Sequence, residues 1–323
     1  MTNAEPKDNL TRAMQLVLLA MAPGALASVW FFGLGVLTNL LVTMLASIGF
    51  ESLALHLRKQ NVRAGIGDGS AAITGALIAL AMPPTLPLWM LVSASGIAIL
   101  LAKHASGGCG RNVFNPAMAG YAYMLMLFPA AFTHWPQGFD GTIDGISGAT
   151  ALDVFRQNRA DLVADWWHTH PAFGDYGGRG WEWINLIFLG GGIFLLQRKI
   201  IRWHAPVAAI AALSLCAAIF YDSGSSASGG SPFMHLLSGG TMLGFFFVVT
   251  EPVTLPDRKH SQIVYGALIG ATVFCIRHWG DFSDGIAFAV LLGNAVAPLL
   301  DRVFASSAFA AMTAKRGEAI DSE

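Results

Sequence analysis

The segment Gly75-Ala-Leu-Ile-Ala-Leu-Ala-Met-Pro83-Pro-Thr-Leu-Pro87 is a short apolar run that stops at proline. The segment Gly244-Phe-Phe-Phe-Val-Val-Thr-Glu-Pro252-Val-Thr-Leu-Pro256 follows 169 residues later, with five identical residues in register. Short segments interrupted by Gly or Pro at corresponding places in two halves are expected of broken helices in an inverted repeat. We therefore predict two broken helices that face each other near the membrane midplane. Two proline-stopped helices that match by coincidence are the alternative.

The composition is typical of a membrane protein. Hydrophobic residues make up 54% of the chain and charged residues 12%, whereas a soluble domain carries about 25% charged residues. The apolar residues come in long runs, as membrane-spanning helices require. The first run is too long for a cleaved signal peptide. We predict ten spanning helices, near residues 14–33, 35–55, 69–82, 88–104, 117–133, 181–197, 204–221, 234–250, 261–278 and 285–303.

Ten spans divide into two halves of five, and an odd number of spans in each half makes the halves inverted. The predicted fold class is an all-α polytopic membrane protein with two inverted five-helix repeats. The first repeat would occupy residues 1–133 and the second residues 181–305. Residues 134–180 would form a loop between the repeats, and residues 306–323 would form a tail.

The distribution of Lys and Arg orients these spans, because both residues are enriched in cytoplasmic loops. With the N-terminus in the cytoplasm, 15 of them fall on the cytoplasmic side and 4 on the other side. The four are Arg156, Arg159, Arg179 and Arg277. Both termini would then be cytoplasmic, and the loop 134–180 would lie outside the cytoplasm.

That loop contains the run Asp144-Gly-Ile-Ser147-Gly148-Ala149-Thr150. It resembles the acceptor motif of flavin transferases of the bacterial envelope, which link the phosphate of FMN to the hydroxyl of the final Thr. Gly148 and Ala149 have no side chain or a small one, so the backbone beside Thr150 would be accessible for binding by a second enzyme. The resemblance implies covalent FMN at Thr150, with Asp144, Ser147, Gly148 and Ala149 as the motif around it. An ordinary turn or a helix cap is the alternative.

A second glycine-rich stretch, residues 106–118, links two predicted helices. The side-chain amides of Asn112 and Asn115 suit the polar edge of a flavin ring, and Phe114 could stack on its face. Asn115 followed by Pro116 is also an ordinary signal for the start of a helix. The stretch therefore predicts either a cofactor contact or a plain helix start.

Glu51 and Glu251 lie at or near membrane depth in the predicted spans. Acidic residues there are candidates for an ion or proton path, unless they are solvent-exposed groups at helix ends.

The three cysteines form no C-x-x-C pair, so neither a zinc nor an iron–sulfur site is predicted within the chain. A net charge of −1 does not indicate the basic surface that nucleic-acid binding requires. No nucleotide-binding signature is present in the sequence.

The motifs at 107–117, 144–150 and 250–253 together resemble the D subunits of Rnf-type ion-translocating oxidoreductases. The same family includes the B subunit of the sodium-pumping NADH:quinone reductase. The resemblance implies a flavin-carrying subunit of a six-subunit complex that passes electrons between a ferredoxin or flavodoxin pool and NAD, coupled to Na⁺ or H⁺ movement. It also implies a non-covalent flavin such as riboflavin, a second flavinylated subunit as partner, a urea-channel-like fold and a bacterial inner membrane.

Two positions depart from the family pattern. Cys109 stands where a plain apolar residue is expected, and Glu251 stands where Asp is more familiar. A charge role survives the second change, because both residues are acidic. The alternatives are the quinone-reductase subunit, a small-solute channel without a redox role, and a scaffold that is never flavinylated. A covalently bound flavin would separate the redox subunits from the channel and from the scaffold.

Overall fold

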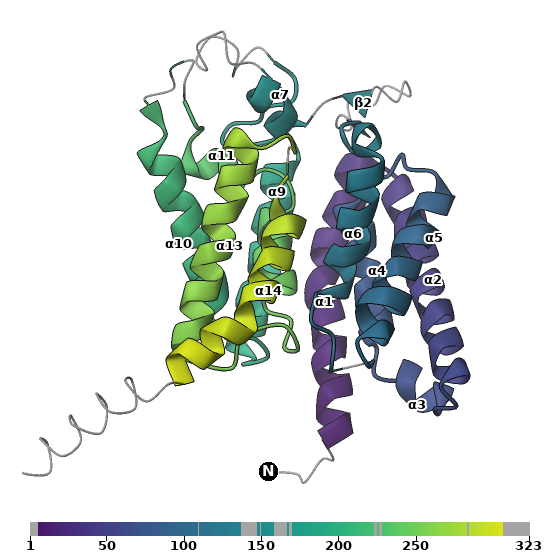
Figure 1. Cartoon of the computed structure of the whole chain (residues 1–323). Coiled ribbons are helices and arrows are strands. Elements are labelled where there is room, and N and C mark those ends of the chain that lie inside the picture. The colour runs from purple at the N-terminus through teal and green to yellow at the C-terminus, as the bar shows by residue number, and fades with distance from the viewer. Residues whose placement is uncertain are drawn as a thin grey trace, which may run out of the picture.

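The computed structural model describes residues 6–108, 110–136, 147–148, 150–157, 167, 170–222, 225, 228–282 and 284–305. Its long helices form two groups, which stand side by side in Figure 1. The first group contains α1 (Pro6–Phe32), α2 (Gly35–Leu57), α3 (Val62–Ile66), α4 (Ser70–Ala81), α5 (Leu88–Gly96), its π-helical continuation η1 (Ile97–Ala105), α6 (Pro116–Leu127) and the 3₁₀ turn η2 (Pro129–Phe132). The second group contains α9 (Trp181–Gln197), α10 (His204–Ile219), α11 (Pro232–Leu236), α12 (Thr241–Leu243), the π-helical η4 (Gly244–Val248), α13 (Lys259–Trp279) and α14 (Ile286–Ala305).

A short ladder and one short helix lie between these groups in the sequence. Strand β1 (Trp135–Pro136) pairs antiparallel with β2 (Ser147–Gly148), and α7 (Ala151–Gln157) follows. The two groups contact each other through α1 and α9 and through α6 and α14. These two helix pairs therefore lie at the interface between the groups.

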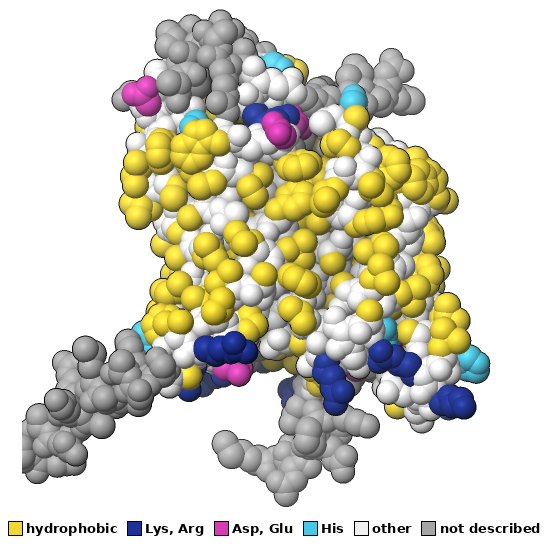
Figure 2. Space-filling view, viewed as in Figure 1, with side chains coloured by type: hydrophobic (Ala, Val, Ile, Leu, Met, Phe, Trp, Pro, Cys, Tyr) yellow, Lys and Arg dark blue, Asp and Glu magenta, His cyan; other side chains and the backbone are white. Residues whose placement is uncertain are grey.

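The helices make the chain a multi-pass membrane protein. Within the described residues, Leu10–Phe32, Gly35–Leu57, Leu88–Ala105 and Ile286–Ala305 are long and apolar enough to cross a membrane. Shorter apolar helices occupy Ser70–Ala81, Trp181–Gln197 and His204–Ile219. Apolar side chains cover most of the visible face in Figure 2, and Lys and Arg gather along its lower edge.

Two predicted spans differ from the structure. The predicted helix 117–133 is α-helical only to Leu127, because Pro129 begins a separate 3₁₀ turn. The predicted helix 234–250 is divided, since α11 ends at Leu236 and the next helix begins at Thr241. Gly239 lies between them with φ +59°, a backbone conformation that residues other than Gly rarely adopt.

The ends of the broken helices are held by amide side chains. Asn39 of α2 donates to the carbonyl of Pro83, just after the end of α4 (3.1 Å). Asn185 of α9 donates to the carbonyl of Gly239 (2.8 Å) and accepts from the N–H of Met242 (2.9 Å). Backbone groups freed by a helix break inside a membrane protein need such protein partners.

Small residues allow the closest packing between helices. An ideal Cβ added at Gly266 or Gly270 of α13 would lie 2.1 or 2.2 Å from the carbonyl oxygens of Ala205 or Ala209 in α10. No side chain fits at either position without moving the backbone of α10. This spacing of small residues is typical of helix pairs in membranes.

Candidate functional site

Thr150 stands at the beginning of α7. Its C=O accepts from the N–H of Val154 (2.9 Å), and its Oγ1 accepts from the N–H of Asp153 (3.2 Å). Thr150 is therefore the N-cap residue of α7. The helix cap that the sequence allowed is present, and the capping hydroxyl belongs to a residue that also lines a cavity.

Helix α7 is fixed by its apolar side chains. Leu152, Val154 and Phe155 pack with Phe173 and Met234 in one buried cluster. This cluster anchors α7 on the second helix group, since Met234 belongs to α11. The position of Thr150 at the cavity follows from that anchoring.

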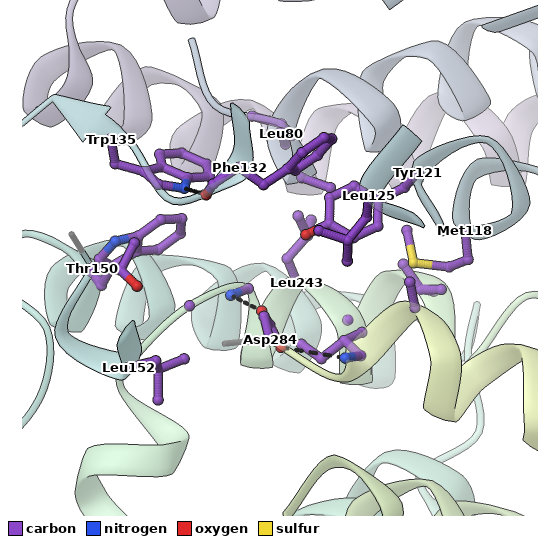
Figure 3. A pocket seen from close by; sticks show the side chains of 18 residues that line it. Leu80, Met118, Tyr121, Leu125, Phe132, Trp135, Thr150, Leu152, Leu243 and Asp284 are labelled. Carbon is purple, nitrogen blue, oxygen red and sulfur yellow. Dashed lines mark hydrogen bonds between the residues drawn. The ribbon is translucent and has the colours of Figure 1, made fainter. Parts of the chain in front are cut away.

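We call the space beside Thr150 the Thr150 cavity. Its volume is about 60 Å³. Its walls come from α4, α6, β1, α7, α9, α12, η4 and α14, so both helix groups contribute to it. In Figure 3, Trp135, Phe132 and Leu125 lie on one side of the cavity, and Thr150, Leu152 and Asp284 lie on the other.

Aromatic rings gather at this cavity. Trp135 and Trp181 both line it, with ring centroids 4.8 Å apart, and Phe32 packs against both at 5.3 and 4.9 Å. Tyr121 and Phe132, also in the lining, are 5.3 Å apart. Such rings offer flat apolar surfaces to a planar ligand.

Asp284 is the one charged side chain among the described residues that line the Thr150 cavity. Its carboxylate accepts from Arg277 Nη2 (3.0 Å) and from the N–H groups of Gly240 (3.2 Å) and Ile286 (3.3 Å). Asp284, paired with Arg277, therefore accepts hydrogen bonds from backbone N–H groups at the starts of both α12 and α14. Arg277, one of the four residues counted on the non-cytoplasmic side, is buried and also donates to Thr241 Oγ1 (2.9 Å).

The rest of the motif is described only in part. Asp144 and Ala149 lie outside the described residues, as does Cys109. The backbone of Ser147 is paired with Pro136 and that of Gly148 with Trp135. The ladder therefore joins the motif to β1, whose Trp135 lines the cavity.

A second cavity, which we call the Glu251 cavity, lies between the same helix groups and is larger, at about 280 Å³ by the same measure. The half-buried carboxylate of Glu251 lines it and accepts three side-chain hydrogen bonds. Asn112 Nδ2 donates to Oε1 (3.1 Å), and Asn115 Nδ2 (3.1 Å) and Thr254 Oγ1 (2.9 Å) donate to Oε2. The structure thus joins an acidic residue and two amides that are distant in the sequence.

The position of Asn115 follows from its role at the start of α6. Its Oδ1 accepts from the N–H of Met118 (3.0 Å), and Pro116 follows at the first helical position. Its own N–H donates to Asn294 Oδ1 (2.8 Å), and Asn294 donates to the hydroxyl of Tyr265 (2.8 Å). The amide that contacts Glu251 is therefore held by α6, α13 and α14 together.

The hydrogen-bond partners of Glu251 are neutral within the part of the chain that the structure describes. They stabilise the carboxylate form without cancelling its charge. A negative group with neutral partners attracts a cation or a proton when a cavity gives access. The arrangement can therefore bind a small cation or exchange a proton.

Glu51 has different surroundings. Its carboxylate lies 2.9 Å from Lys103 Nζ and 3.0 Å from His104 Nε2, and all three side chains are buried. Lys103 also donates to Ser70 Oγ (2.8 Å). Glu51 is therefore not a wet helix-end residue, and Lys103 is not a surface charge. The charge of Glu51 is balanced within the protein.

The residues that the sequence grouped around a flavin line two different cavities. Helix α6 begins at the Glu251 cavity, where Asn112 and Asn115 lie, whereas Tyr121 and Leu125 farther along it line the Thr150 cavity. Phe114 is exposed and lines neither cavity, and its C=O accepts from Asn112 (3.2 Å).

The two proline-stopped segments run antiparallel. Ser70 and Leu77 of α4 line the Glu251 cavity, and Ala81 near its end lines the Thr150 cavity. The opposite order holds after α12, where Gly244 lines the Thr150 cavity and Glu251 the other. The end of α4 thus lies at the Thr150 cavity, and Pro252 lies at the Glu251 cavity.

Sequence reasoning missed Asp153, Asp284 and Arg277. The spacing Thr150-x-x-Asp153 resembles a helix capping box, which was a usable signal for the start of α7. The contact between Arg277 and Asp284 crosses from the end of α13 to the turn before α14, and no spacing in the sequence marks it.

Comparison with a family model and with individual known proteins points to the same family. The model of the NQR2, RnfD, RnfE family matches residues 2–310. The D subunit of an ion-translocating oxidoreductase complex from Cellvibrio japonicus is 46% identical over 322 residues, covering 93% of this chain and 90% of the relative. Proteins of the same name from Ectopseudomonas mendocina and Salmonella enteritidis are 41% and 42% identical, covering 93% and 90% of this chain and 91% and 92% of their own.

Proposed function

Because the chain belongs to the NQR2, RnfD, RnfE family, we propose that it is the flavin-carrying membrane subunit of an ion-translocating electron transport complex. Electrons would pass through FMN ester-linked to Thr150, coupled to movement of Na⁺ or H⁺. The observation that carries this proposal is the position of Thr150, which lines a cavity between the two helix groups beside two tryptophans.

The residues around Thr150 fit a flavin. Thr150 supplies the hydroxyl for a phosphoester, and Trp135 and Trp181 offer aromatic faces for a planar ring system. The carboxylate of Asp284 is already bound to Arg277, so the cavity wall carries an ion pair instead of a lone negative charge. When bound, the flavin supplies one- and two-electron transfer. The protein's part would be to hold the flavin beside these apolar side chains and to limit the access of water.

Ion coupling would use Glu251. Its carboxylate faces the larger cavity with neutral partners, whereas Glu51 is already paired with Lys103 and His104. Lys103 lines the same cavity, but its charge is paired with that of Glu51, so a cation or proton at Glu251 would complete the charge there. Glu51 suits a structural role better than ion binding, and we retain Glu251 as the candidate for the ion path.

The proposed architecture is two inverted five-helix repeats. An offset of 169 residues relates the elements of one group to those of the other, for example α4 to the α12–η4 segment and α6 to α14. The cavities follow the same offset. Ser70, Thr74, Asn115 and Ala117 line the Glu251 cavity, and their counterparts Gly239, Leu243, Asp284 and Ile286 line the Thr150 cavity. This correspondence supports the repeat and a urea-channel-like fold.

The proposed topology places the Thr150 cavity toward the periplasm of a bacterial inner membrane and both termini in the cytoplasm. The exposed residues Arg58, Arg198, Arg202 and Arg258, in connections between helices, and Arg63 in the short helix α3 support this orientation. The partners would be the other subunits of a six-subunit Rnf-type complex, one of them also flavinylated, and a flavin transferase. Riboflavin would be the second, non-covalent flavin.

Attachment is tested by the mass and the fluorescence of the denatured chain. The wild-type chain should carry a mass increase equal to esterified FMN and should fluoresce in a denaturing gel. Thr150→Val should lose both signals, and Thr150→Ser should keep part of them because a hydroxyl remains. A wild-type chain without flavin would favour a channel or scaffold, and an adduct on Thr150→Val would move the attachment site.

A further inference from the structure

The hydroxyl of Thr150 is hydrogen-bonded to a buried carboxylate. Thr150 Oγ1 donates to Asp153 Oδ2 over 2.8 Å, and the N–H of Asp153 donates back to Oγ1 over 3.2 Å. Asp153 is 0% exposed, although it belongs to a short helix in a loop region. An ordinary capping box would place the acidic side chain on the backbone N–H of the cap residue. Here the carboxylate accepts from the hydroxyl itself.

This geometry is what activation of a hydroxyl requires. A Thr hydroxyl is a weak nucleophile until a base takes its proton, and the base must lie within about 2.6–3.2 Å of the oxygen. The hydrogen of Thr150 already points to Asp153 Oδ2. The oxygen has two lone pairs, and the N–H of Asp153 occupies one of them. The other lone pair is left for attack.

We propose that Asp153 is a built-in proton acceptor for flavin attachment at Thr150, an inference that rests on the function proposed above. The donor must be a flavin nucleotide with a leaving group on phosphorus, and a flavin dinucleotide with its pyrophosphate meets that need. A bond forms between Thr150 Oγ1 and the flavin-side phosphorus. The pyrophosphate P–O bond breaks, AMP leaves with its electron pair, and the Thr150 proton passes to Asp153. No group is oxidised or reduced.

The product also favours this route for the proton. The new phosphodiester carries a negative charge next to the carboxyl group of Asp153. Two adjacent anions repel each other, and protonation of one removes the repulsion. A proton that stays on Asp153 would therefore lower the energy of the flavinylated site as well as assist its formation.

The test must separate a base from a hydrogen-bond acceptor that only positions the hydroxyl, and two substitutions do so. Asp153→Asn keeps an oxygen that can accept the Thr150 hydrogen bond and keeps the backbone N–H, but it cannot take a proton. Asp153→Ala loses the acceptor altogether. A role limited to positioning the Thr150 hydroxyl predicts that Asn functions and Ala fails, whereas a base predicts that both fail.

The experiment uses the full-length chain, produced without flavin transferase and purified in detergent. Transferase and flavin adenine dinucleotide are then added, and the rate of mass gain is followed for wild type, Asp153→Asn, Asp153→Ala and Thr150→Val. Asp222→Asn is the matched control, because Asp222 is exposed and its carboxylate accepts from Ser225 Oγ. Thermal unfolding of each chain before the reaction identifies variants that fail to fold.

We expect Asp153→Asn to fold as wild type and to gain flavin at least ~100-fold more slowly, the usual size of a general-base contribution. Asp222→Asn should react at the wild-type rate. If Asp153→Asn reacts as fast as wild type while Thr150→Val is inert, Asp153 only positions the Thr150 hydroxyl and attachment at Thr150 stands. If Thr150→Val is flavinylated, the proposed attachment site itself is wrong.

Discussion

The side-chain amide of Asn115 donates to the carboxylate of Glu251 over 3.1 Å, across 136 positions of sequence. Asn115 starts α6 in the first helix group, and Glu251 follows η4 in the second. The contact therefore joins the two halves of the protein at the larger cavity. A change in the charge of Glu251 would directly alter its hydrogen bond with Asn115 at the start of α6.

We expect Glu251→Gln to weaken ion coupling without loss of flavin. The substitution keeps the shape and an acceptor for Asn112 or Asn115, but it removes the charge. Loss of one charge-assisted contact is worth about 1.5–3 kcal/mol, or roughly 10- to 100-fold in cation affinity. Glu251→Asp should retain much of the activity. Vesicles that contain the assembled complex would report electron transfer and ion uptake per electron.

The control for this prediction is Asp257→Asn, an exposed acidic residue on the same connection as Glu251. It should behave as wild type in both measurements. Wild-type rate and stoichiometry in Glu251→Gln would make Glu251 a structural residue at the end of a helix, and another group would have to carry the ion.

Lys103→Met should destabilise the fold, because it leaves the buried Glu51 with His104 as its remaining ion-pair partner. Removal of one member of a buried ion pair typically costs about 3–5 kcal/mol. The double variant Glu51→Gln with Lys103→Met should be more stable than Lys103→Met alone. Unfolding of the four chains in detergent closes the double-mutant cycle, and additive effects would contradict the pairing.

The proposed topology predicts different labelling of two sites. Single cysteines at Gln60 and Tyr176, both exposed, would be placed in a chain without the three native cysteines. An impermeant thiol reagent added to intact cells should label position 176 and spare position 60. Labelling of position 60 alone would invert the orientation and would put Thr150 out of reach of an enzyme outside the cytoplasm.

The sequence predicted the helices well because lipid imposes simple rules on it. Long apolar runs and helix-stopping prolines are local signals, so the positions of α2, α4 and α9 could be read directly. The break before Thr241 was missed, because Ser238, Gly239 and Gly240 interrupt an otherwise apolar segment for only a few residues.

The candidate sites were predicted less completely, since they depend on contacts between distant segments. Asn115 and Glu251 were each singled out, but the hydrogen bond that joins them comes from the packing of α6 beside the end of η4. The burial of Lys103 and Arg277 was also missed. Counting charges along a sequence treats every Lys and Arg as a surface group, whereas each of these two meets a carboxylate.

The packing of α10 against α13 gives a last prediction. Gly270→Ala would place a methyl group 2.2 Å from the carbonyl oxygen of Ala209, and backbone cannot move aside as a flexible side chain can. Forcing an extra methyl group into such a contact costs about 1–3 kcal/mol. The matched control is Gly190→Ala in α9, where nothing lies within 4 Å of the added atom. That change should be neutral or should stabilise the helix by up to ~1 kcal/mol. Thermal unfolding in detergent compares the two variants, and equal shifts would mean that α10 and α13 lie farther apart than described.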